Sequence, residues 1–308
     1  MNLQQLEYIV ALDTHRHFVN AAKACGVSQP TLSTLVTRLE EELDTAIFDR
    51  SAHPIRPTAV GEKIIEQAKA VLLKLAQIKE LSLNEREQKS GKIRLGVIPT
   101  VAPYIIPPLF NELQQYKEQI DLHVSEQQTH IIVDQIRKGE LDMAILATPL
   151  NNDDILEIPL YYEKFIAYVS PKEEIHAQSE IQSSLMPTEH LWVLKEGHCM
   201  RNQIFNFCES KSEYAQIYEA GSINTLIGIV DANGGYTIIP ELHIPLLSQQ
   251  QQTHLRPLSE PTPVREISLI LRTDYVRQGL VNTIVDAVKA VIPEDMIDAR
   301  LKKFAVKL

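Results

Sequence analysis

The feature that most constrains the fold is the turn between two helical patterns at residues 24–31. Residues 18–25 form a helical pattern rich in small side chains. Gly26 can adopt the positive φ that ends a helix, Ser28 is a favourable N-cap, and Pro30 lies in a first helical turn, where its missing N–H costs nothing. The sequence therefore predicts two short helices joined by a tight turn, a helix-turn-helix.

The helix predicted from Gln29 to Leu43 has one apolar and one polar face. Its apolar positions follow the spacing of one buried stripe and are Leu32, Leu35, Val36, Leu39 and Leu43. The polar face combines short side chains with a guanidinium, which suits base edges and phosphates in a major groove. The candidate DNA contacts are Ser28, Gln29, Pro30, Thr31, Ser33, Thr34, Thr37 and Arg38. An ordinary solvated face is the alternative for this helix taken alone.

Two further patterns favour DNA reading by a pair of subunits. Residues 46–58 have the pattern of a two-stranded wing, with Arg50 and Arg56 placed to meet phosphates. Thr58 then caps a helix that is expected to run to about residue 89. Apolar residues recur along this helix at the spacing of a heptad seam, which predicts a homodimer. The seam positions are Ile64, Ala68, Val71, Leu75 and Ile78. The alternative is a helix that lies on its own domain.

Charge and composition exclude several classes of protein. Lys and Arg number 30 and Asp and Glu 40, so the formal net charge is −10. Residues 1–90 hold 11 basic and 12 acidic side chains. The affinity of this part for DNA is therefore expected to depend on a few arginines at specific positions. We find no apolar stretch of about 18 residues and no signal-peptide pattern at the N-terminus, and three cysteines do not make a disulfide framework. We therefore expect a cytoplasmic protein.

From about residue 91 the pattern changes to short apolar strands that alternate with amphipathic helices. Strands are expected at 93–98, 122–126 and 143–146, with helices between them. This order implies a parallel sheet with right-handed crossovers. The remaining chain is too long for one small α/β unit, so we expect two subdomains.

Two of the three cysteines, Cys199 and Cys208, lie in one short segment with helical periodicity. Gly197 precedes Cys199, which places this thiol at a helix N-terminus, where free N–H groups and the helix dipole favour a thiolate. Cys199 is therefore a candidate low-pKa nucleophile, and Cys208 falls on the buried stripe of the same helix. Cys25 lies among small residues of the earlier helix, and we interpret it as a packed core thiol.

The spacing of the pair predicts a conformational switch. Nine residues of helix rise about 13.5 Å, whereas a disulfide needs Cα atoms about 4.4–6.8 Å apart. A bond between Cys199 and Cys208 therefore requires the helix to unwind. Two unreactive buried cysteines are the alternative. Zinc is disfavoured because no Cys/His pairs with ligand spacing converge, so we expect neither a metal nor a cofactor.

The whole chain resembles the LysR-type transcriptional regulators. The resemblance rests on Ala21-Ala22, Ser28-Gln29-Pro30-Thr31-Leu32-Ser33, Leu39-Glu40, Phe48-Asp49-Arg50 and Thr58-Ala59-Val60-Gly61. It implies an α/β fold with a winged helix-turn-helix at 1–58, a dimerising linker helix at 59–90 and an effector domain at 91–308. The effector domain is expected to hold two Rossmann-like subdomains, as in periplasmic binding proteins, at about 91–163 with 266–308 and about 164–265. The family also implies a homotetramer.

Within this family, the effector domain is similar to the regulators that sense hydrogen peroxide. The matching stretches are Ile98–Tyr104, Glu126–His130, Gly139–Asp142, Glu196–Arg201 and Phe207-Cys208. The resemblance implies that Cys199 is the peroxidatic cysteine and Cys208 the resolving one. It also places Thr100, Thr129, His198 and Arg265 around the peroxide. Arg265 is then expected to stabilise the thiolate and the leaving hydroxide.

These observations predict a DNA-binding regulator, not an enzyme, that activates oxidative-stress genes through a reversible Cys199–Cys208 disulfide. Its expected partners are double-stranded operator DNA, hydrogen peroxide, RNA polymerase and a thioredoxin- or glutaredoxin-type reductant, with no membrane. One rival is a regulator that binds a small metabolite in the interdomain cleft, near Ser222, Asn224 and Thr225. Another is a thiol peroxidase, against which the full helix-turn-helix argues.

Overall fold

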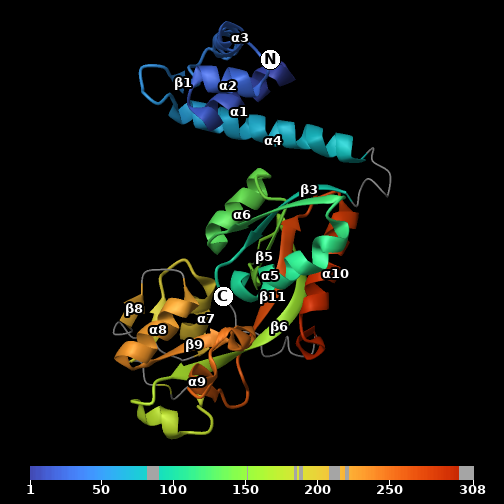
Figure 1. Cartoon of the computed structure of the whole chain (residues 1–308). Helices are drawn as coiled ribbons and strands as arrows, with labels where there is room; N and C mark the ends of the chain where they lie inside the picture. Colours follow the sequence, from blue (N-terminus) through green and yellow to red (C-terminus); the bar gives the residue numbers. More distant parts are fainter. Residues whose placement is uncertain are drawn as a thin grey trace. The chain divides into compact units, whose positions relative to one another are not determined.

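The computed structural model describes residues 1–81, 90–150, 152–183, 186, 190–207, 216–218 and 222–297 (Figure 1). The chain divides into two compact units, Met1–Leu83 and Asn84–Leu308. The N-terminal unit contains α1 (Leu3–His15), α2 (Phe18–Ala24), α3 (Gln29–Glu42), β1 (Phe48–Asp49), β2 (Arg56–Pro57) and α4 (Ala59–Leu81). Its helices enclose an apolar core to which Ile9, Leu12, Leu32 and Leu39 contribute fully buried side chains.

The turn between α2 and α3 confirms the predicted helix-turn-helix. Gly26 has a φ of 67°, the left-handed conformation that a glycine adopts without strain. Ser28 is the N-cap of α3, and its hydroxyl accepts a hydrogen bond from the Thr31 N–H at 3.3 Å. Pro30 lies in the first turn of α3. Of the predicted apolar stripe, Leu32, Val36 and Leu39 are buried, whereas Leu43 is exposed.

The wing and the cap of the long helix are also confirmed. Strands β1 and β2 pair antiparallel, with Phe48 opposite Pro57. The Thr58 hydroxyl accepts from the Gly61 N–H at 2.9 Å and donates to the Ala46 carbonyl at 2.8 Å. One side chain thus starts α4 and ties it to the segment that leads into the wing.

The predicted seam of α4 splits into two parts. Ala68 is buried in the core of its own unit, and Ile64 packs against that core. Here the alternative of a helix lying on its own domain is correct. Farther along, Val71 and Ile78 are 46% and 65% exposed, so apolar side chains remain uncovered on the later turns. The rest of the predicted helix, 82–89, lies outside the described residues.

The C-terminal unit begins with the predicted parallel arrangement. Strands β3 (Gly91–Val97), β4 (Ile120–Glu126) and β5 (Met143–Thr148) pair in parallel, with β3 in the middle. The connections are α5 (Ala102–Glu112) with the 3-10 turn η2 (Leu113–Tyr116), and α6 (Thr129–Lys138). Both connections run over a sheet whose β5 side chains are all buried.

Two long strands extend this sheet. Strands β6 (Ile155–Val169) and β11 (Val264–Arg272) pair antiparallel, and β11 also pairs with β5. At its other end, β6 pairs with β9 (Tyr236–Pro240) and β10 (Leu255–Pro257). The strand order is β10-β6-β11-β5-β3-β4, with β9 also on β6. The subdomain division expected at 163/164 and 265/266 therefore falls within two continuous strands.

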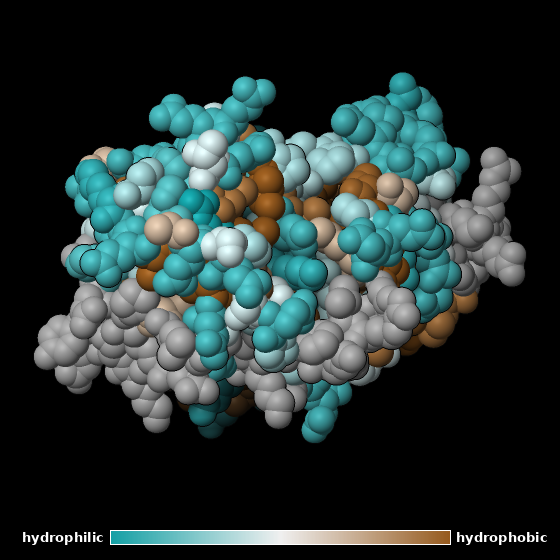
Figure 2. All heavy atoms as spheres, turned by 90° about the horizontal axis from the view of Figure 1, so that it is seen from below, coloured by the Kyte–Doolittle hydropathy of each residue, from teal (hydrophilic) through white to brown (hydrophobic). Residues whose placement is uncertain are grey.

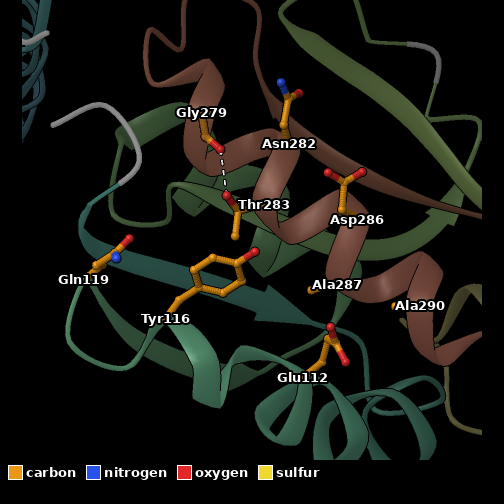
Figure 3. A pocket seen from close by; sticks show the side chains of 9 residues that line it. All are labelled: Glu112, Tyr116, Gln119, Gly279, Asn282, Thr283, Asp286, Ala287 and Ala290. Carbon is orange, nitrogen blue, oxygen red and sulfur yellow. Dashed lines mark hydrogen bonds between the residues drawn. The ribbon is translucent and has the colours of Figure 1, made fainter. Parts of the chain in front are cut away.

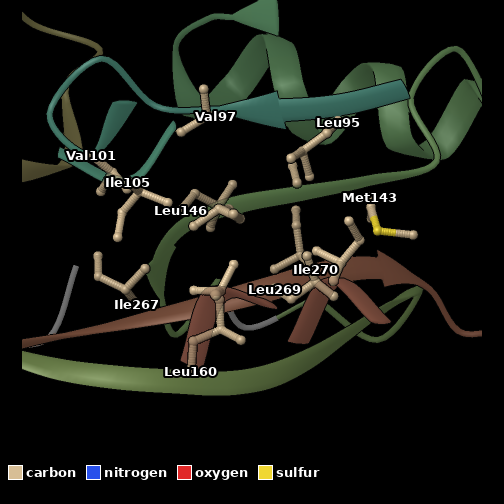
Figure 4. Packing of buried hydrophobic residues seen from close by; sticks show 14 of the residues in the cluster. Leu95, Val97, Val101, Ile105, Met143, Leu146, Leu160, Ile267, Leu269 and Ile270 are labelled. Atoms are coloured by element: carbon tan, nitrogen blue, oxygen red, sulfur yellow. The ribbon is translucent and has the colours of Figure 1, made fainter. Parts of the chain in front are cut away.

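Two hydrophobic clusters lie along these strands. The first joins β3, β5 and β11 to α5 and α10 (Gln278–Val291), and Figure 4 shows side chains of these strands within it, among them Leu95, Leu146 and Ile267. The second joins the ends of β6 and β9 to three elements, which are β7 (Trp192–Leu194), α7 (Cys199–Phe207) and α8 (Ile223–Asn233).

The remaining elements are short: η3 (Glu174–Ala177), β8 (Gln216–Tyr218, parallel to β7), η5 (Glu241–Leu246), α9 (Gln249–Gln252) and η6 (Glu294–Ile297). The face in Figure 2 is mostly hydrophilic, with apolar side chains in small groups between polar ones. Among the described residues, we find no helix that combines the length and the apolar character needed to cross a membrane.

Candidate functional site

The candidate DNA-contacting residues lie on one helix and the adjoining wing. Most of them are exposed, namely Ser28, Gln29, Pro30, Thr31, Thr34, Arg38, Arg50 and Arg56. Ser33 and Thr37 are half-buried. The buried stripe of α3 turns the polar side chains of this helix away from the core, an arrangement that suits a helix docked in a major groove.

Arg50 also has a structural role that the sequence did not reveal. Its Nη2 donates to the Thr37 hydroxyl at 2.8 Å and to Glu40 Oε2 at 2.7 Å. The other oxygen of Glu40 accepts the backbone N–H groups of Ile47 and Phe48. Glu40 therefore holds the wing against α3, and the side chain of Arg50 stays 41% exposed beside it.

Cys199 is the first residue of α7 and lies where the two hydrophobic clusters meet. Its side chain belongs to the cluster around β3 and β11, whereas Met200, the next residue, belongs to the cluster around β9. Cys199 is a free thiol and is 8% exposed. The predicted position at a helix N-terminus is confirmed.

The expectation of a low thiol pKa is wrong for this conformation. Burial raises the pKa of Cys199 above its ordinary value. The positive charge of Arg265, the Thr129 hydroxyl and the backbone N–H groups of Met200 and Cys199 lower that pKa, but their sum is smaller. The groups that favour the thiolate are thus present as predicted, and removal of the thiol from water outweighs them.

Arg265 is fully buried, and its guanidinium is held by four hydrogen bonds. Nη1 donates to the Thr100 hydroxyl at 3.0 Å, and Nη2 donates to the Thr100 carbonyl at 2.9 Å and the Tyr104 hydroxyl at 2.6 Å. Nε donates to Glu163 Oε1 at 2.7 Å. The pKa of Arg265 is raised despite its burial, because Glu163 and neighbouring groups favour its charge. Arg265 therefore presents a fixed positive charge near the thiol.

Glu163 and Tyr104 complete this network, and neither was among the predicted site residues. The Tyr104 hydroxyl donates to Glu163 Oε1 at 2.8 Å. Tyr104 stands in one of the matching stretches, which was an available signal. Glu163 offered none, because its proximity to Arg265 arises only from the register of β6 and β11, in which the two residues are direct partners.

A pocket of about 500 Å³ opens beside the thiol. Its lining comes from α6, the segment after β5 and the start of α7: Thr129, His130, Val133, Asp134, Arg137, Pro149, Leu150, Gly197, His198, Cys199 and Asn202. The Thr129 hydroxyl is buried next to the Cys199 sulfur, whose pKa it lowers. The pocket thus brings together Cys199, Thr129 and His198. Thr100 and Arg265 do not line it and lie in the buried network.

His198 is 5% exposed, and burial lowers its pKa. Its Nε2 lies 3.5 Å from the side-chain nitrogen of Gln128. A lowered pKa leaves the imidazole neutral at pH 7, so it offers a hydrogen bond and not a charge. Cys208, the predicted resolving cysteine, lies outside the described residues.

A second pocket lies between α5, η2 and α10 and shares no lining residue with the first (Figure 3). Glu112 and Asp286 give it two carboxylates. Over the described residues, we find no group of three His, Cys, Asp or Glu side chains that could hold a metal ion.

Comparison with known families agrees with this architecture. Residues 3–62 match the bacterial regulatory helix-turn-helix protein, lysR family, and residues 86–293 match the LysR substrate binding domain. The chain belongs to the LysR family of transcriptional regulators. Its curated relatives include the hydrogen peroxide-inducible genes activator of Pectobacterium carotovorum, 33% identical over 94% of this chain and 96% of that protein. The dual regulator OxyR of Escherichia coli is 32% identical over 94% and 95%.

Solved structures give the same relationship. A full-length OxyR variant from Pseudomonas aeruginosa aligns with a TM-score of 0.80 at 34% identity, covering 94% of this chain and 98% of that one. Reduced OxyR from Porphyromonas gingivalis aligns with a TM-score of 0.63 at 34% identity, covering 70% and 99%. This LysR-family chain therefore combines a DNA-binding domain with an effector domain of the OxyR type.

Proposed function

We propose that this LysR-family regulator senses hydrogen peroxide through Cys199 and thereby controls oxidative-stress genes. The observation that carries the proposal is the thiol itself, which begins α7 beside an open pocket, with the buried charge of Arg265 close enough to lower its pKa. The names of the relatives, which refer to hydrogen peroxide-inducible genes, support it.

The first step is nucleophilic attack on peroxide. The thiolate sulfur of Cys199 forms a bond to one peroxide oxygen, the O–O bond breaks, and the leaving hydroxide takes a proton to become water. Cys199 is oxidised to a sulfenic acid, and peroxide is reduced. The Thr129 hydroxyl and the neutral His198 ring are hydrogen-bonding groups for peroxide in the pocket, and Arg265 offsets negative charge as it develops.

The second step is closure of a disulfide with Cys208, which releases a second water. Helix α7 extends from Cys199 to Phe207, a rise of about 12 Å at 1.5 Å per residue. A disulfide needs Cα atoms no more than about 6.8 Å apart. Oxidation therefore requires α7 to unwind, and a thioredoxin- or glutaredoxin-type reductant would reverse the change.

Unwinding of α7 would alter DNA binding through the contacts between subunits of the assembled protein. We propose a homodimer through the exposed apolar turns of α4, paired further into a tetramer, that reads an operator with α3 and the wing and acts on RNA polymerase. Two helix-turn-helix units in one dimer would read half-sites separated by whole turns of DNA.

The second candidate is a regulator controlled by a small metabolite, and the open pocket of about 500 Å³ favours it. The three residues first considered for such a ligand, Ser222, Asn224 and Thr225, do not line this pocket. Asn224 Oδ1 instead lies 2.9 Å from His243 Nε2.

Trypsin separates the two cysteines, which makes the test direct. Cleavage after Lys195, Arg201 and Lys211 places Cys199 in peptide 196–201 and Cys208 in peptide 202–211. After micromolar peroxide, we expect mass spectrometry to show these peptides joined by a disulfide, and dithiothreitol to release them. The same samples are assayed for binding to promoter DNA.

Two variants control this experiment. Cys208→Ser should accumulate a sulfenic acid on peptide 196–201, trapped by dimedone, without the cross-link. Cys25→Ser should behave as wild type, because this thiol is remote in sequence and its burial raises its pKa. If peptide 196–201 is not oxidised, the proposed peroxide sensing is wrong, and regulation by a small metabolite becomes the leading hypothesis.

A further inference from the structure

We propose that Glu163 is the counter-ion that limits how much of the positive charge of Arg265 acts on the Cys199 sulfur. Glu163 is then a positioning residue that sets the reactivity of the thiol. The role in peroxide sensing rests on the function proposed above, whereas the electrostatic role concerns the thiol alone.

The geometry places one full negative charge against one full positive charge. Glu163 and Arg265 are direct cross-strand partners on β6 and β11, and their side chains are both 0% exposed. Oε1 accepts the Arg265 Nε–H at 2.7 Å and the Tyr104 hydroxyl at 2.8 Å. Oε2 has no hydrogen-bond partner among the described residues. Because both side chains are fully buried, solvent screens their charges only weakly.

This arrangement makes Glu163→Gln a nearly pure change of charge. The Gln carbonyl oxygen can replace Oε1 and accept from both Arg265 and Tyr104. The amide nitrogen takes the place of Oε2, which has no partner to lose. The hydrogen bonds from Arg265 and Tyr104 to this side chain therefore survive, while the negative charge that opposes the field of Arg265 disappears.

Glu163→Gln substitutes none of the other charged and titratable groups around the thiol and Arg265. The charge that it removes also raises the pKa values of Tyr104, Tyr161 and Glu241 on η5, which should therefore fall in the variant. The groups near Cys199 or in its pocket are His198 directly before α7, His130, Asp134 and Arg137 on α6, and Arg265 on β11. Those around Arg265 are Tyr104 on α5, Tyr161 on β6 and His243 on η5. Burial and Arg265 lower the pKa of His243 to about 4, so this imidazole is neutral at pH 7 and adds no charge.

The expected result is a lower thiol pKa. With Glu163 neutral, the whole charge of Arg265 favours the Cys199 thiolate, and we expect the pKa to fall by about one unit. Alkylation by iodoacetamide at pH 7, measured on tryptic peptide 196–201, should then be severalfold faster than in wild type. The thiolate fraction rises about tenfold, while the nucleophilicity of the lower-pKa thiolate falls by a smaller factor. The limiting rate at alkaline pH, where the thiol is fully ionised, should fall by no more than the lower nucleophilicity of the thiolate requires, which shows that access to the sulfur is unchanged.

Two controls separate charge from loosened packing. Glu163→Asp shortens the side chain but keeps its charge, so its thiol pKa should stay closer to wild type than that of the Gln variant. Glu266→Gln removes a second buried carboxylate of the same strand pair, whose partners are the hydroxyls of Thr148 and Tyr162. It should leave the thiol pKa at the wild-type value. If Glu163→Gln does not fold, Glu163→Met removes the same charge and carries the same expectation.

The proposal is overturned if folded Glu163→Gln keeps or raises the thiol pKa, or if Glu163→Asp lowers it equally. Peroxide is a separate arm of the experiment. Faster alkylation together with faster peroxide oxidation of peptide 196–201 supports both the counter-ion and the sensing function. Faster alkylation without any peroxide oxidation supports the counter-ion and counts against the sensing function.

Discussion

Replacing Gly61 by Ala adds one methyl group and should destabilise the N-terminal unit while leaving the stability of the effector unit unchanged. A Cβ at Gly61 would lie 1.9 Å from the Ile47 carbonyl oxygen and 2.8 Å from its carbon. Carbon contacts are favourable only near 3.5 Å, so Gly61→Ala must push the backbone apart by about 1.5 Å. Backbone atoms cannot turn aside as a side-chain tip can, so α4 and the wing have to separate.

The cost follows from what that separation breaks. The Ile47 carbonyl accepts the Thr58 N–H at 2.9 Å, a bond worth about 1 kcal/mol. Overpacking adds about 1–3 kcal/mol, so we expect a loss of about 3 kcal/mol out of a typical 5–15 kcal/mol. For a unit of this size, each kcal/mol lowers the melting temperature by about 4–8 °C. The transition of the N-terminal unit should therefore fall by about 12–24 °C.

Calorimetry of the full chain measures this result, together with binding to duplex DNA at low salt and 37 °C, which should weaken sharply. Gly228→Ala is the matched control, because Gly228 also lies inside a helix but a Cβ there meets nothing within 4 Å. It should stabilise the effector unit by about 0.5–1 kcal/mol. A melting temperature of the Gly61→Ala N-terminal unit within about 3 °C of wild type would correspond to a loss of unfolding free energy below about 1 kcal/mol. Such a result would refute this reasoning.

Three further outcomes are expected. Thr58→Val removes the oxygen that caps the Gly61 N–H and should cost the N-terminal unit about 1 kcal/mol by thermal melting, with Thr58→Ser close to wild type. Ile78→Lys places a charge on the exposed turns of α4 and should halve the molar mass found by light scattering; an unchanged mass would exclude α4 as the dimer seam. In wild type, alkylation of Cys199 should rise about tenfold per pH unit between pH 7 and 8, because below its pKa the thiolate fraction does so. A rate that does not vary over this range would contradict the raised pKa.

The features that were predicted correctly are those whose causes are local. Gly26, Ser28 and the cap that Thr58 gives to the Gly61 N–H act within four residues of themselves, and β5 is a continuous apolar run. Periodicity was less informative where it depends on what covers a face. Ile64 and Ala68 repeat as a seam would, yet they pack into their own unit, because a heptad pattern does not specify its partner.

The candidate site shows the same limit more sharply. The N-terminal position of Cys199 followed from the pattern around it, but its burial depends on strands and helices from the whole effector unit. Local reasoning thus found the groups that lower the thiol pKa and missed the desolvation that exceeds them. Glu163 is 102 residues from Arg265 along the chain, and no spacing in the sequence indicates that the two are partners.

A raised pKa is compatible with a sensor that reacts selectively. Below its pKa a thiol has less thiolate, but the nucleophilicity of the thiolate rises with pKa, so part of the loss is recovered. The site should accelerate the reaction with peroxide by stabilising the transition state, in which negative charge passes from the sulfur to the leaving oxygen. A fixed Arg265 and a Thr129 hydroxyl held beside the sulfur cost no reorganisation at that moment, and interactions gained only in the transition state accelerate the step. Iodoacetamide carries no O–O bond and would gain none of this. Replacing Arg265 by Met should therefore slow peroxide oxidation of Cys199 by a larger factor than it slows alkylation at the same pH. Equal factors in the two assays would mean that Arg265 acts only through the pKa.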